Sequence, residues 1–346
     1  MMRYRDAGVD VARSDAIKDE VIREIRSTWG EEVSPIPGGF AGVMRFPGAP
    51  GLLAATLDGV GTKLHLAASA PAGERERRLA DAAADLVYHG ANDLLVHGAK
   101  PLALLDYVAQ ARLDPAAVLA VVRGLARACR EVGAALLGGE TAEMPDTYLP
   151  DVLDVAGCML GTVSPQALLD GSRARAGDHV LGLAASGLHT NGYSLARRVL
   201  AASELAADAP LPGGAGESVL DALLAPHRWY GRSVMPLVEQ GRIRALAHVT
   251  GGGIPGNLVR VLPAGVRARV RAGAWPRPAL FRWIVVAGAV PEEDARTALN
   301  LGVGMLAVVE PSLSAQVADA LRAAGETVWP VGDLVPGERG VEWIGP

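Results

Sequence analysis

The stretch Leu52-Leu53-Ala54-Ala55-Thr56-Leu57-Asp58-Gly59-Val60-Gly61-Thr62-Lys63 changes abruptly from an apolar run to a polar, glycine-containing segment. The apolar half predicts a short buried strand over 52–57, and the polar half predicts a loop at its end. Glycines there let backbone N–H groups approach phosphate oxygens, Lys63 supplies positive charge, and Asp58 can hold Mg²⁺. The segment lacks the glycine spacing of a P-loop. An ordinary tight turn is the alternative interpretation.

The same alternation of apolar runs and glycine-rich loops continues along the chain. Further strands are predicted over 101–108, 134–137, 152–163 and 179–184, with helices over 79–97, from Asp114 (N-cap) to Gly133, and through Leu195 and Val199. Alternating strands and helices predict an α/β (α+β) fold. The 346 residues suggest about two domains. We expect each to be a sheet with packed helices, over 1–168 and 169–346, because a polar stretch separates the halves near residue 168.

The composition excludes several classes of function. With 33 basic and 38 acidic residues, the formal charge is −5, so the chain lacks the positive field of a nucleic-acid-binding protein. Cys129 and Cys158 form no closely spaced pair and are interpreted as buried thiols in a reducing compartment. No apolar run approaches the roughly 18 residues of a membrane span, and the first residues show no signal peptide. These features predict a cytoplasmic protein with no membrane or nucleic-acid partner.

Three acidic residues occupy predicted element ends in the first half. Asp58 ends the first strand, and Glu140 follows Gly138-Gly139 at the predicted end of another. Asp93 is in phase with the apolar face of the predicted helix over 79–97, so it is either a buried carboxylate that needs compensation or a solvated residue at a frayed end. Carboxylates facing a triphosphate repel it unless Mg²⁺ lies between them. We therefore predict a metal–nucleotide site.

Two loops in the second half have the character of binding loops. Ser186 to Ser194 offers hydroxyls, an amide and the imidazole of His189 before a helix, which suits a monophosphate and ribose hydroxyls. The other six histidines are interpreted as structural. The run from Gly251 to Gly256 matches the dinucleotide fingerprint in letters, but Pro255 lies within it and no acidic residue follows about 20 positions on. It is better interpreted as a turn that a phosphate can approach.

Together these blocks closely resemble the phosphoribosylformylglycinamidine cyclo-ligase family, the aminoimidazole ribonucleotide synthetases. The blocks that carry the resemblance are Tyr4 to Asp10, Gly38-Gly39-Phe40, Asp58 to Lys63, Asn92-Asp93-Leu94, Gly138 to Pro145, Asp154 to Gly157, Ser186 to Ser194 and Thr250 to Gly253. They run nearly from end to end. Asp93 and Gly98-Ala99-Lys100-Pro101 also match the signature of the ATP-binding superfamily that includes thiamine-monophosphate kinase, selenophosphate synthetase, formylglycinamidine ribonucleotide synthetase and the hydrogenase-maturation dehydratase.

The resemblance implies an ATP-dependent ring closure in the fifth step of purine biosynthesis. Formylglycinamidine ribonucleotide and ATP would give 5-aminoimidazole ribonucleotide, ADP and phosphate, through phosphorylation of the formyl amide oxygen and attack by the amidine nitrogen. It also implies ATP as co-substrate, Mg²⁺, and a homodimer whose N-terminal sheets pair into a shared barrel. Catalysis would rest mainly on charge neutralisation and positioning.

The resemblance further implies roles for individual residues. The ATP-binding set would be Gly38, Gly39, Phe40, Asp58, Gly59, Gly61, Thr62, Lys63, Asn92, Asp93, Gly138, Gly139 and Glu140. Asp58, Asp93 and Glu140 would hold the metal, Lys63 would contact phosphate, and Gly38 to Phe40 would form a lid. The substrate-binding set would be Ser186, Gly187, His189, Thr190, Asn191, Gly251, Gly252 and Gly253. Asp58, Lys63 and His189 would be catalytic, with His189 a proton donor or oxyanion partner.

Two loops depart from the family pattern and leave alternatives open. Ile254-Pro255-Gly256-Asn257 replaces an aromatic and Glu-Asn, and Ala298 to Gly302 lacks an aromatic and a hydroxyl. The nearest alternative is another ATP-dependent phosphotransfer enzyme of the superfamily, such as a thiamine-monophosphate kinase. A nicotinamide dehydrogenase would rest only on the Gly251 turn, and a non-catalytic nucleotide-binding regulator would not need Asp58, Asp93, Glu140 and Lys63 intact.

Overall fold

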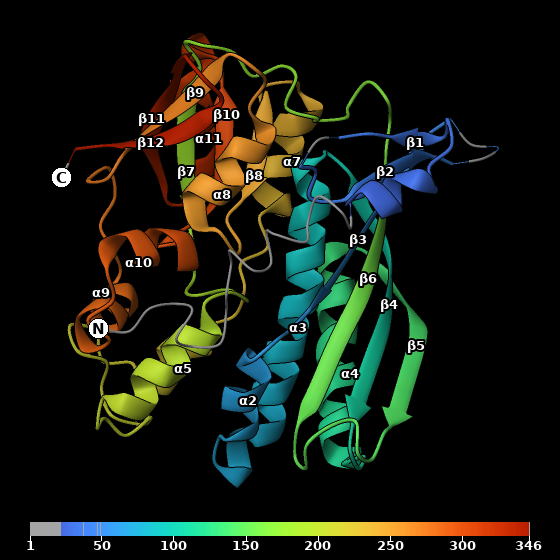
Figure 1. Cartoon of the computed structure of the whole chain (residues 1–346), viewed down its shortest axis with the longest axis vertical. Helices are drawn as coiled ribbons and strands as arrows, with labels where there is room; N and C mark the ends of the chain where they lie inside the picture. Colours follow the sequence, from blue (N-terminus) through green and yellow to red (C-terminus); the bar gives the residue numbers. More distant parts are fainter. Residues whose placement is uncertain (1–21, 37, 47, 49, 346) are drawn as a thin grey trace.

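The computed structural model describes residues 22–36, 38–46, 48 and 50–345. The block from Tyr4 to Asp10 lies outside the described residues. The chain forms two six-stranded sheets, each with packed helices (Figure 1). The predicted α/β (α+β) class with two sheet-and-helix layers is therefore confirmed.

The first sheet has the strand order β1-β2-β3-β6-β4-β5. Its strands are β1 (Val33–Ser34), β2 (Gly42–Arg45), β3 (Leu52–Gly59), β4 (Lys100–Gln110), β5 (Ala135–Glu143) and β6 (Leu153–Val163). All neighbours are antiparallel except β4 and β5, which are joined through a crossover helix. β3 is longer than predicted, so Asp58 and Gly59 belong to the strand. β5 runs through Gly138 and Gly139 to Glu143, so the prediction that this strand ends at Gly138 is wrong.

The helices α2 (Lys63–Ala68), α3 (Ala72–Val96) and α4 (Pro115–Val132) accompany this sheet. The predicted bounds of α4 are confirmed. Asp114 accepts hydrogen bonds from the N–H groups of Ala116 and Ala117, and Gly133 ends the helix with φ 79°. Small residues bring the helices close: a Cβ on Gly124 of α4 would lie 2.0 Å from the carbonyl oxygen of Ala80.

The second sheet has the order β12-β9-β11-β7-β10-β8 and is mixed, with only β12 and β9 parallel. Its strands are β7 (His179–Ala184), β8 (Ala245–His248), β9 (Val266–Arg271), β10 (Val303–Val309), β11 (Val328–Pro336) and β12 (Gly340–Ile344). The accompanying helices are α5 (Tyr193–Ala202), α6 (Val219–Leu223), α7 (Gly231–Glu239), α8 (Gly253–Leu258), α9 (Ala279–Ala287), α10 (Glu292–Ala298) and α11 (Ser314–Ala323), with short 3₁₀ turns η2 (Val259–Val261) and η3 (Pro311–Leu313).

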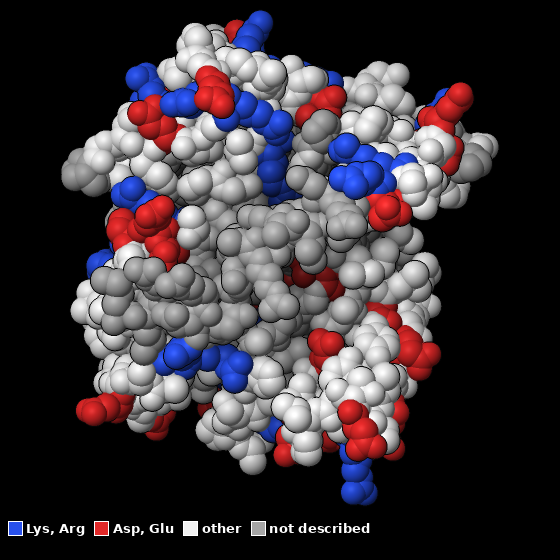
Figure 2. All heavy atoms as spheres, viewed as in Figure 1, with Lys and Arg blue, Asp and Glu red and all other residues white. Residues whose placement is uncertain are grey.

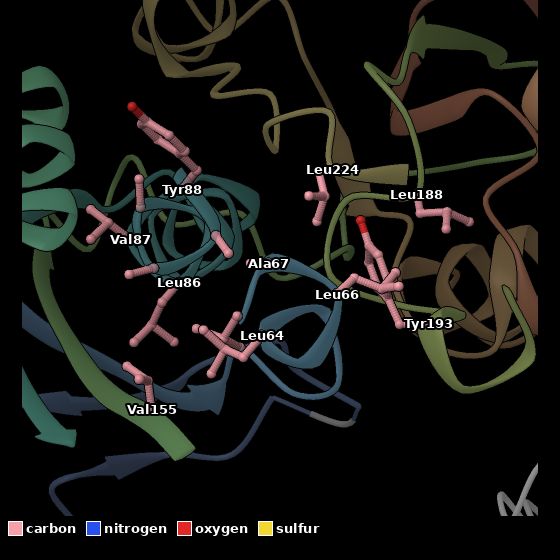
Figure 3. Close-up of a cluster of buried hydrophobic side chains, with 14 of the residues drawn as sticks. Leu64, Leu66, Ala67, Leu86, Val87, Tyr88, Val155, Leu188, Tyr193 and Leu224 are labelled. Atoms are coloured by element: carbon pink, nitrogen blue, oxygen red, sulfur yellow. The ribbon is translucent and has the colours of Figure 1, made fainter. Parts of the chain in front are cut away.

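The hydrophobic core continues from one domain into the other through α2. Figure 3 shows Leu64 of α2 beside Leu86 of α3 and Val155 of β6, while Leu66 lies toward Tyr193 of the second domain. All belong to one buried cluster. Burial of this apolar surface contributes roughly 25 cal/mol per Å², and it fixes α3 between the two sheets (Figure 1). The carboxyl end of β3 and the loop after β7 consequently both reach α3 at His89.

The opposite face of the first sheet carries apolar side chains but no described helix (Figure 1). We call it the open face and define it by four exposed leucines: Leu57, Leu102, Leu105 and Leu137. Leu57 and Leu137 are 74% and 64% exposed. Cys158 lies in the same row as Leu57 and Leu105 and is only partly buried, so the prediction of two buried thiols is wrong for Cys158. Solvent-facing strand positions are ordinarily polar, so four exposed leucines make this face unusually apolar.

Within the described part of the chain, no helix has both the length and the apolarity to cross a membrane.

Candidate active site

The site forms where α3 meets the carboxyl end of β3 and two loops of the second domain. Asp93 is buried near the end of α3, as one of the two sequence interpretations requires. Its carboxylate accepts hydrogen bonds from Nδ1 of His248 at 2.8 Å and from the hydroxyl of Thr56 at 3.4 Å. These donors compensate the buried charge. Asp58 lies next to it, with its side chain 47% exposed.

His89 links these carboxylates to the second domain. Its Nε2 lies 2.8 Å from Oδ2 of Asp58 and 3.5 Å from Oδ2 of Asp93, and its Nδ1 lies 2.6 Å from the hydroxyl oxygen of Thr190. Asp58, His89 and Asp93 each offer a ligand atom within 4.8 Å of the others, which is one of two such groups among the described residues. The second group is His89, His227 and His248.

The imidazoles of His227 and His248 continue the network. Their Nε2 atoms lie 3.1 Å apart. Nε2 of His227 also lies 3.2 Å from the amide nitrogen of Asn92, so this nitrogen is shared between Asn92 and His248. His227 also stacks on His189, with ring centroids 4.0 Å apart. Asn92 fixes the same segment, since its amide donates to the carbonyl of Arg228 at 2.8 Å and accepts from the N–H of Tyr230 at 3.2 Å.

Burial and neighbouring charges together determine the pKa values of these groups. Burial lowers the pKa of His89, but the carboxylates of Asp93 and Asp58 outweigh it and raise that pKa to about 8. Burial opposes ionisation of Asp58, yet its contacts with His89 and the Gly59 N–H lower its pKa. Burial holds the pKa of His189 well below its usual range, and neighbouring cations lower it further. His189 is therefore neutral at pH 7.

Lys63 lies in a helix and not in the loop that the sequence predicted. It is the first residue of α2, it is fully buried, and it forms an ion pair with Asp85 of α3. Its ammonium also donates to the carbonyl of Ala225 at 2.7 Å. Asp85 accepts a further hydrogen bond from the N–H of His227 at 2.9 Å. In this arrangement the Lys63 ammonium is directed into the interface between the domains.

The glycine segment Gly38-Gly39-Phe40 is held against the second domain. Arg260 donates to the carbonyls of Gly38 and Gly39, and its guanidinium lies 3.6 Å from the Phe40 ring centroid. His97 accepts hydrogen bonds from the N–H groups of Phe40 at 2.9 Å and Ala41 at 3.3 Å, and its Nδ1 donates to the carbonyl of Leu169. Burial lowers the pKa of His97, so the neutral acceptor form is retained. We call residues 38–40 the glycine segment.

The predicted substrate loop connects β7 to α5 and is held by hydrogen bonds. His189 adopts φ 63°, and its Nε2 accepts a hydrogen bond from the N–H of Ser186 at 3.2 Å. Its Nδ1 is buried and has no hydrogen-bond partner among the described residues. Asn300 donates to the carbonyl of Gly187 at 2.9 Å, so the asparagine kept in the altered 298–302 loop supports this loop.

The Gly251 turn lies beside the same loop. A Cβ on Gly251 would be 3.2 Å from Oδ1 of Asn191. Gly252 and Gly253 have φ 93° and 60°, and a Cβ on Gly253 would collide with the carbonyl oxygen of Arg296 at 2.0 Å. The glycines therefore allow neighbouring residues to pack closely against the backbone of the turn. Pro255 lies within α8.

Gly138, Gly139 and Glu140 lie apart from the other carboxylates. Asp58 pairs with Gly157, Gly157 with Asp106, and Asp106 with Gly139, so this row crosses from β3 to the edge strand β5. At about 4.8 Å per strand, Glu140 stands roughly 14 Å from Asp58. A single chain does not bring Glu140 to Asp58 and Asp93, although the resemblance implies that all three face ATP and Mg²⁺.

The surface around the site and the pocket nearest to it are not strongly basic. Figure 2 shows acidic side chains in a hollow near the centre of the face, with Lys and Arg gathered mainly above it. A pocket of about 320 Å³ opens beside Ser186 and Gly187 and is lined mostly by apolar residues, with Glu217 and Asp221 on its wall. This wall suits an uncharged group better than a phosphate.

Sequence reasoning missed three histidines of the site by interpreting them as structural. A signal existed for His89, which precedes Asp93 by four residues and therefore shares its helix face. His248 closes the strand before the Gly251 turn. No local signal marks His227, which reaches the site through the packing of the 225–230 segment against α3.

Comparison with known families agrees with this architecture. The family described as "AIR synthase related protein, N-terminal domain" matches residues 38–163. The family "AIR synthase related protein, C-terminal domain" matches residues 175–344. The fold and site thus define an AIR synthase-related protein.

Sequence identity to curated relatives identifies the family within this class. The chain is 43% identical over 337 residues to the phosphoribosylformylglycinamidine cyclo-ligase of Sorangium cellulosum (strain So ce56), covering 96% of this chain and 95% of the relative. It is 39% identical over 338 residues to the chloroplastic phosphoribosylformylglycinamidine cyclo-ligase of Arabidopsis thaliana, covering 97% and 82%. The chain belongs to the phosphoribosylformylglycinamidine cyclo-ligase family, and it is an ATP-dependent ligase of purine biosynthesis.

Solved structures share the fold at lower identity. Thiamine-monophosphate kinase from Stenotrophomonas maltophilia K279a superposes with a TM-score of 0.63 at 21% identity, covering 95% of this chain and 96% of that one. The E. coli hydrogenase maturation protein HypE gives 0.61 at 22% identity, covering 85% and 83%. These similarities show the fold alone.

Proposed function

We propose that the site closes the imidazole ring of 5-aminoimidazole ribonucleotide from formylglycinamidine ribonucleotide, with ATP converted to ADP and phosphate. The observation that carries this proposal is the meeting of Asp58 and Asp93 with the Ser186–Asn191 loop across α3. One side offers carboxylates for a metal–nucleotide, and the other offers hydroxyl, amide and imidazole groups for a ribonucleotide. A poor leaving oxygen can be phosphorylated and displaced only where both substrates are held together.

Asp58 and Asp93 fit a divalent cation. Their oxygens approach each other within 4.8 Å, carboxylate oxygens are the ligands that Mg²⁺ prefers, and the exposed side of Asp58 leaves room for waters and phosphate oxygens. When bound, Mg²⁺ would neutralise charge on the transferred phosphoryl group. Glu140 of the same chain is too distant to join them, so it would have to come from a second copy.

On the nucleotide side, residues of this chain would bind the phosphates and cover the nucleotide. Gly61 and Thr62 connect β3, which ends at Gly59, to α2, and their backbone N–H groups are the proposed phosphate donors. The glycine segment is the proposed lid over the nucleotide. We assign Lys63 a supporting role, in which it holds the 225–230 segment, instead of direct contact with phosphate.

On the substrate side, neutral His189 is the proposed partner of the reacting amide. Its unpartnered Nδ1 carries a proton, because Nε2 accepts from Ser186. The ring is enclosed by Gly304, Tyr230 and His227, so the loop must open before this N–H can donate to the formyl oxygen as charge develops there. Ser186, Gly187, Thr190 and Asn191, with Gly251 to Gly253, are the proposed contacts for ribose and phosphate.

We propose that a second copy of the chain covers the open face. Four exposed leucines on neighbouring strands form an apolar surface that would pair with itself by two-fold symmetry. A homodimer would also bring a second Glu140 toward the first chain. The domain boundary near residue 168 and the cytoplasmic location stay predictions.

The test is a turnover assay with purified protein, ATP, Mg²⁺ and formylglycinamidine ribonucleotide. We expect ADP and 5-aminoimidazole ribonucleotide in equal amounts. Thiamine monophosphate serves as the matched alternative acceptor, because a thiamine-monophosphate kinase shares the fold. ADP formation with thiamine monophosphate, and none with the ribonucleotide, would move the function to that sibling reaction.

A further inference from the structure

We propose that His89 is a positioning residue that couples the nucleotide side of the site to the substrate side. A single imidazole ring contacts Asp58 through Nε2 at 2.8 Å and Thr190 through Nδ1 at 2.6 Å. Asp58 belongs to the first domain and Thr190 to the second. The inference rests on the proposed roles of Asp58 in metal binding and Thr190 in substrate binding.

Both partners depend on this ring for their orientation. Among the described residues, the only other hydrogen-bond donor to Asp58 is the N–H of the neighbouring Gly59, and half of the carboxylate faces solvent. Thr190 stands in a loop outside regular structure, and in the described part of the chain its hydroxyl has one other hydrogen-bond partner, the amide of Asn191 at 3.3 Å. Without His89, both side chains would gain rotamer freedom, and ordering them again on substrate binding costs free energy.

The ring itself is held rigidly. It is almost fully buried and packs edge-on against His248 and His227, with centroid distances of 5.0 and 5.5 Å. The next residue, Gly90, allows α3 to lie close to the sheet, because a Cβ there would be 2.9 Å from Cβ of Met159. This close packing brings His89 within reach of Asp58 on β3.

The two contacts use different nitrogens, so they can be separated by substitution. The amide nitrogen of glutamine occupies the place of Nε2, and that of asparagine occupies the place of Nδ1. His89→Gln therefore keeps the Asp58 contact, whereas His89→Asn keeps the Thr190 contact. A purely structural role would give both variants the same phenotype.

We expect His89→Gln to raise the KM for formylglycinamidine ribonucleotide about five- to tenfold, as the loss of one hydrogen bond predicts, with little change in the Mg²⁺ requirement. His89→Asn should instead lower kcat and raise the Mg²⁺ concentration needed for half-maximal rate. Thr190→Val should reproduce the His89→Gln effect, Thr190→Ser should not, and the double variant His89→Gln with Thr190→Val should be no worse than either single variant. His65→Gln on α2 is the matched control outside the network.

Equal effects of His89→Gln and His89→Asn on both substrates would overturn the proposal. The proposal would also be overturned if the kinetic losses of His89→Gln and Thr190→Val multiplied in the double variant, because independent contributions multiply in rate. Because Thr190→Val changes a loop residue, it tests the contact even if the α3 variants fold poorly. If Thr190→Val and Asp58→Asn both left all kinetic constants unchanged, the proposed site itself would be wrong, and that result differs from a failure confined to His89.

Discussion

Lys63 and Asp85 form an ion pair from which solvent is excluded, at the point where α2 of the first domain meets the 225–230 segment of the second. Lys63→Met should lower the free energy of unfolding by about 3–5 kcal/mol, because it leaves the Asp85 carboxylate buried without a counter-charge. Urea denaturation monitored by circular dichroism would measure this. Lys63→Met combined with Asp85→Leu should recover much of the loss. A stable Lys63→Met enzyme with only a raised KM for ATP would instead support a phosphate contact.

Asp58→Asn should abolish most turnover while leaving the fold intact. The side chain is half exposed, so neutralising it costs little stability, but the variant loses one of the two carboxylates proposed for the metal. We expect kcat to fall roughly 10²-fold or more. Steady-state assays over a Mg²⁺ series, with the melting temperature as control, would check this. A variant with normal kcat and an unchanged Mg²⁺ requirement would remove Asp58 from the metal site.

Gly304→Ala should damage substrate use through His189. The added Cβ would lie 2.2 Å from the Tyr230 hydroxyl and 2.4 Å from Cε1 of His189, so the ring must move. We expect kcat/KM for the ribonucleotide to fall by about 10²-fold, the size of effect that a 1 Å misplacement produces. Gly256→Ala is the matched control, because a Cβ added there would meet open space, with no neighbouring atom within 4 Å. Equal activity of the two variants would contradict the proposed role of His189.

The anchoring of the glycine segment by His97 should depend on pH. Burial lowers the pKa of His97 below the ordinary value of 6.5, and the folded protein needs the neutral ring as an acceptor. The stabilisation is therefore complete above about pH 6.5 and is lost as pH falls through the lower folded pKa. The difference in unfolding free energy between the native protein and His97→Gln should shrink from pH 7.5 to pH 5 (~1 kcal/mol per lost hydrogen bond). A difference that stayed constant or grew on acidification would refute this.

Leu57→Asp and Leu137→Asp should convert a dimer into monomers. Each places a charge on the open face, where covering it would leave the carboxylate buried without a partner. Val286→Asp on α9, which is equally exposed but lies in the second domain, is the matched control. Sedimentation equilibrium would report the association state. Dimers that persist in both leucine variants would show that the open face is not the interface.

Much of the fold could be predicted from local signals. Asp114, Pro115 and Gly133 act through backbone hydrogen bonds and dihedral preferences within a few residues, so the bounds of α4 were predictable. The apolar runs predicted β3, β6 and β7 in the same way. Gly138 and Gly139 misled the prediction, because tertiary pairing with β4 carries β5 through residues that ordinarily interrupt strands.

The sequence by itself determined the family, the two-layer domains, the positions of Asp58 and Asp93 near the ends of their elements, and that of His189 in a loop before a helix. These features depend on residue types and short-range spacing. Only the tertiary structure decided which groups meet. Asp85 pairs with Lys63 and accepts from the N–H of His227, 142 positions away, and His89, His227 and His248 converge from three separate segments. Such contacts follow from the packing of α3 between two sheets, which no local pattern encodes. Burial keeps His189 neutral and removes Lys63 from solvent. Desolvation has this effect only after the domains have closed on these groups.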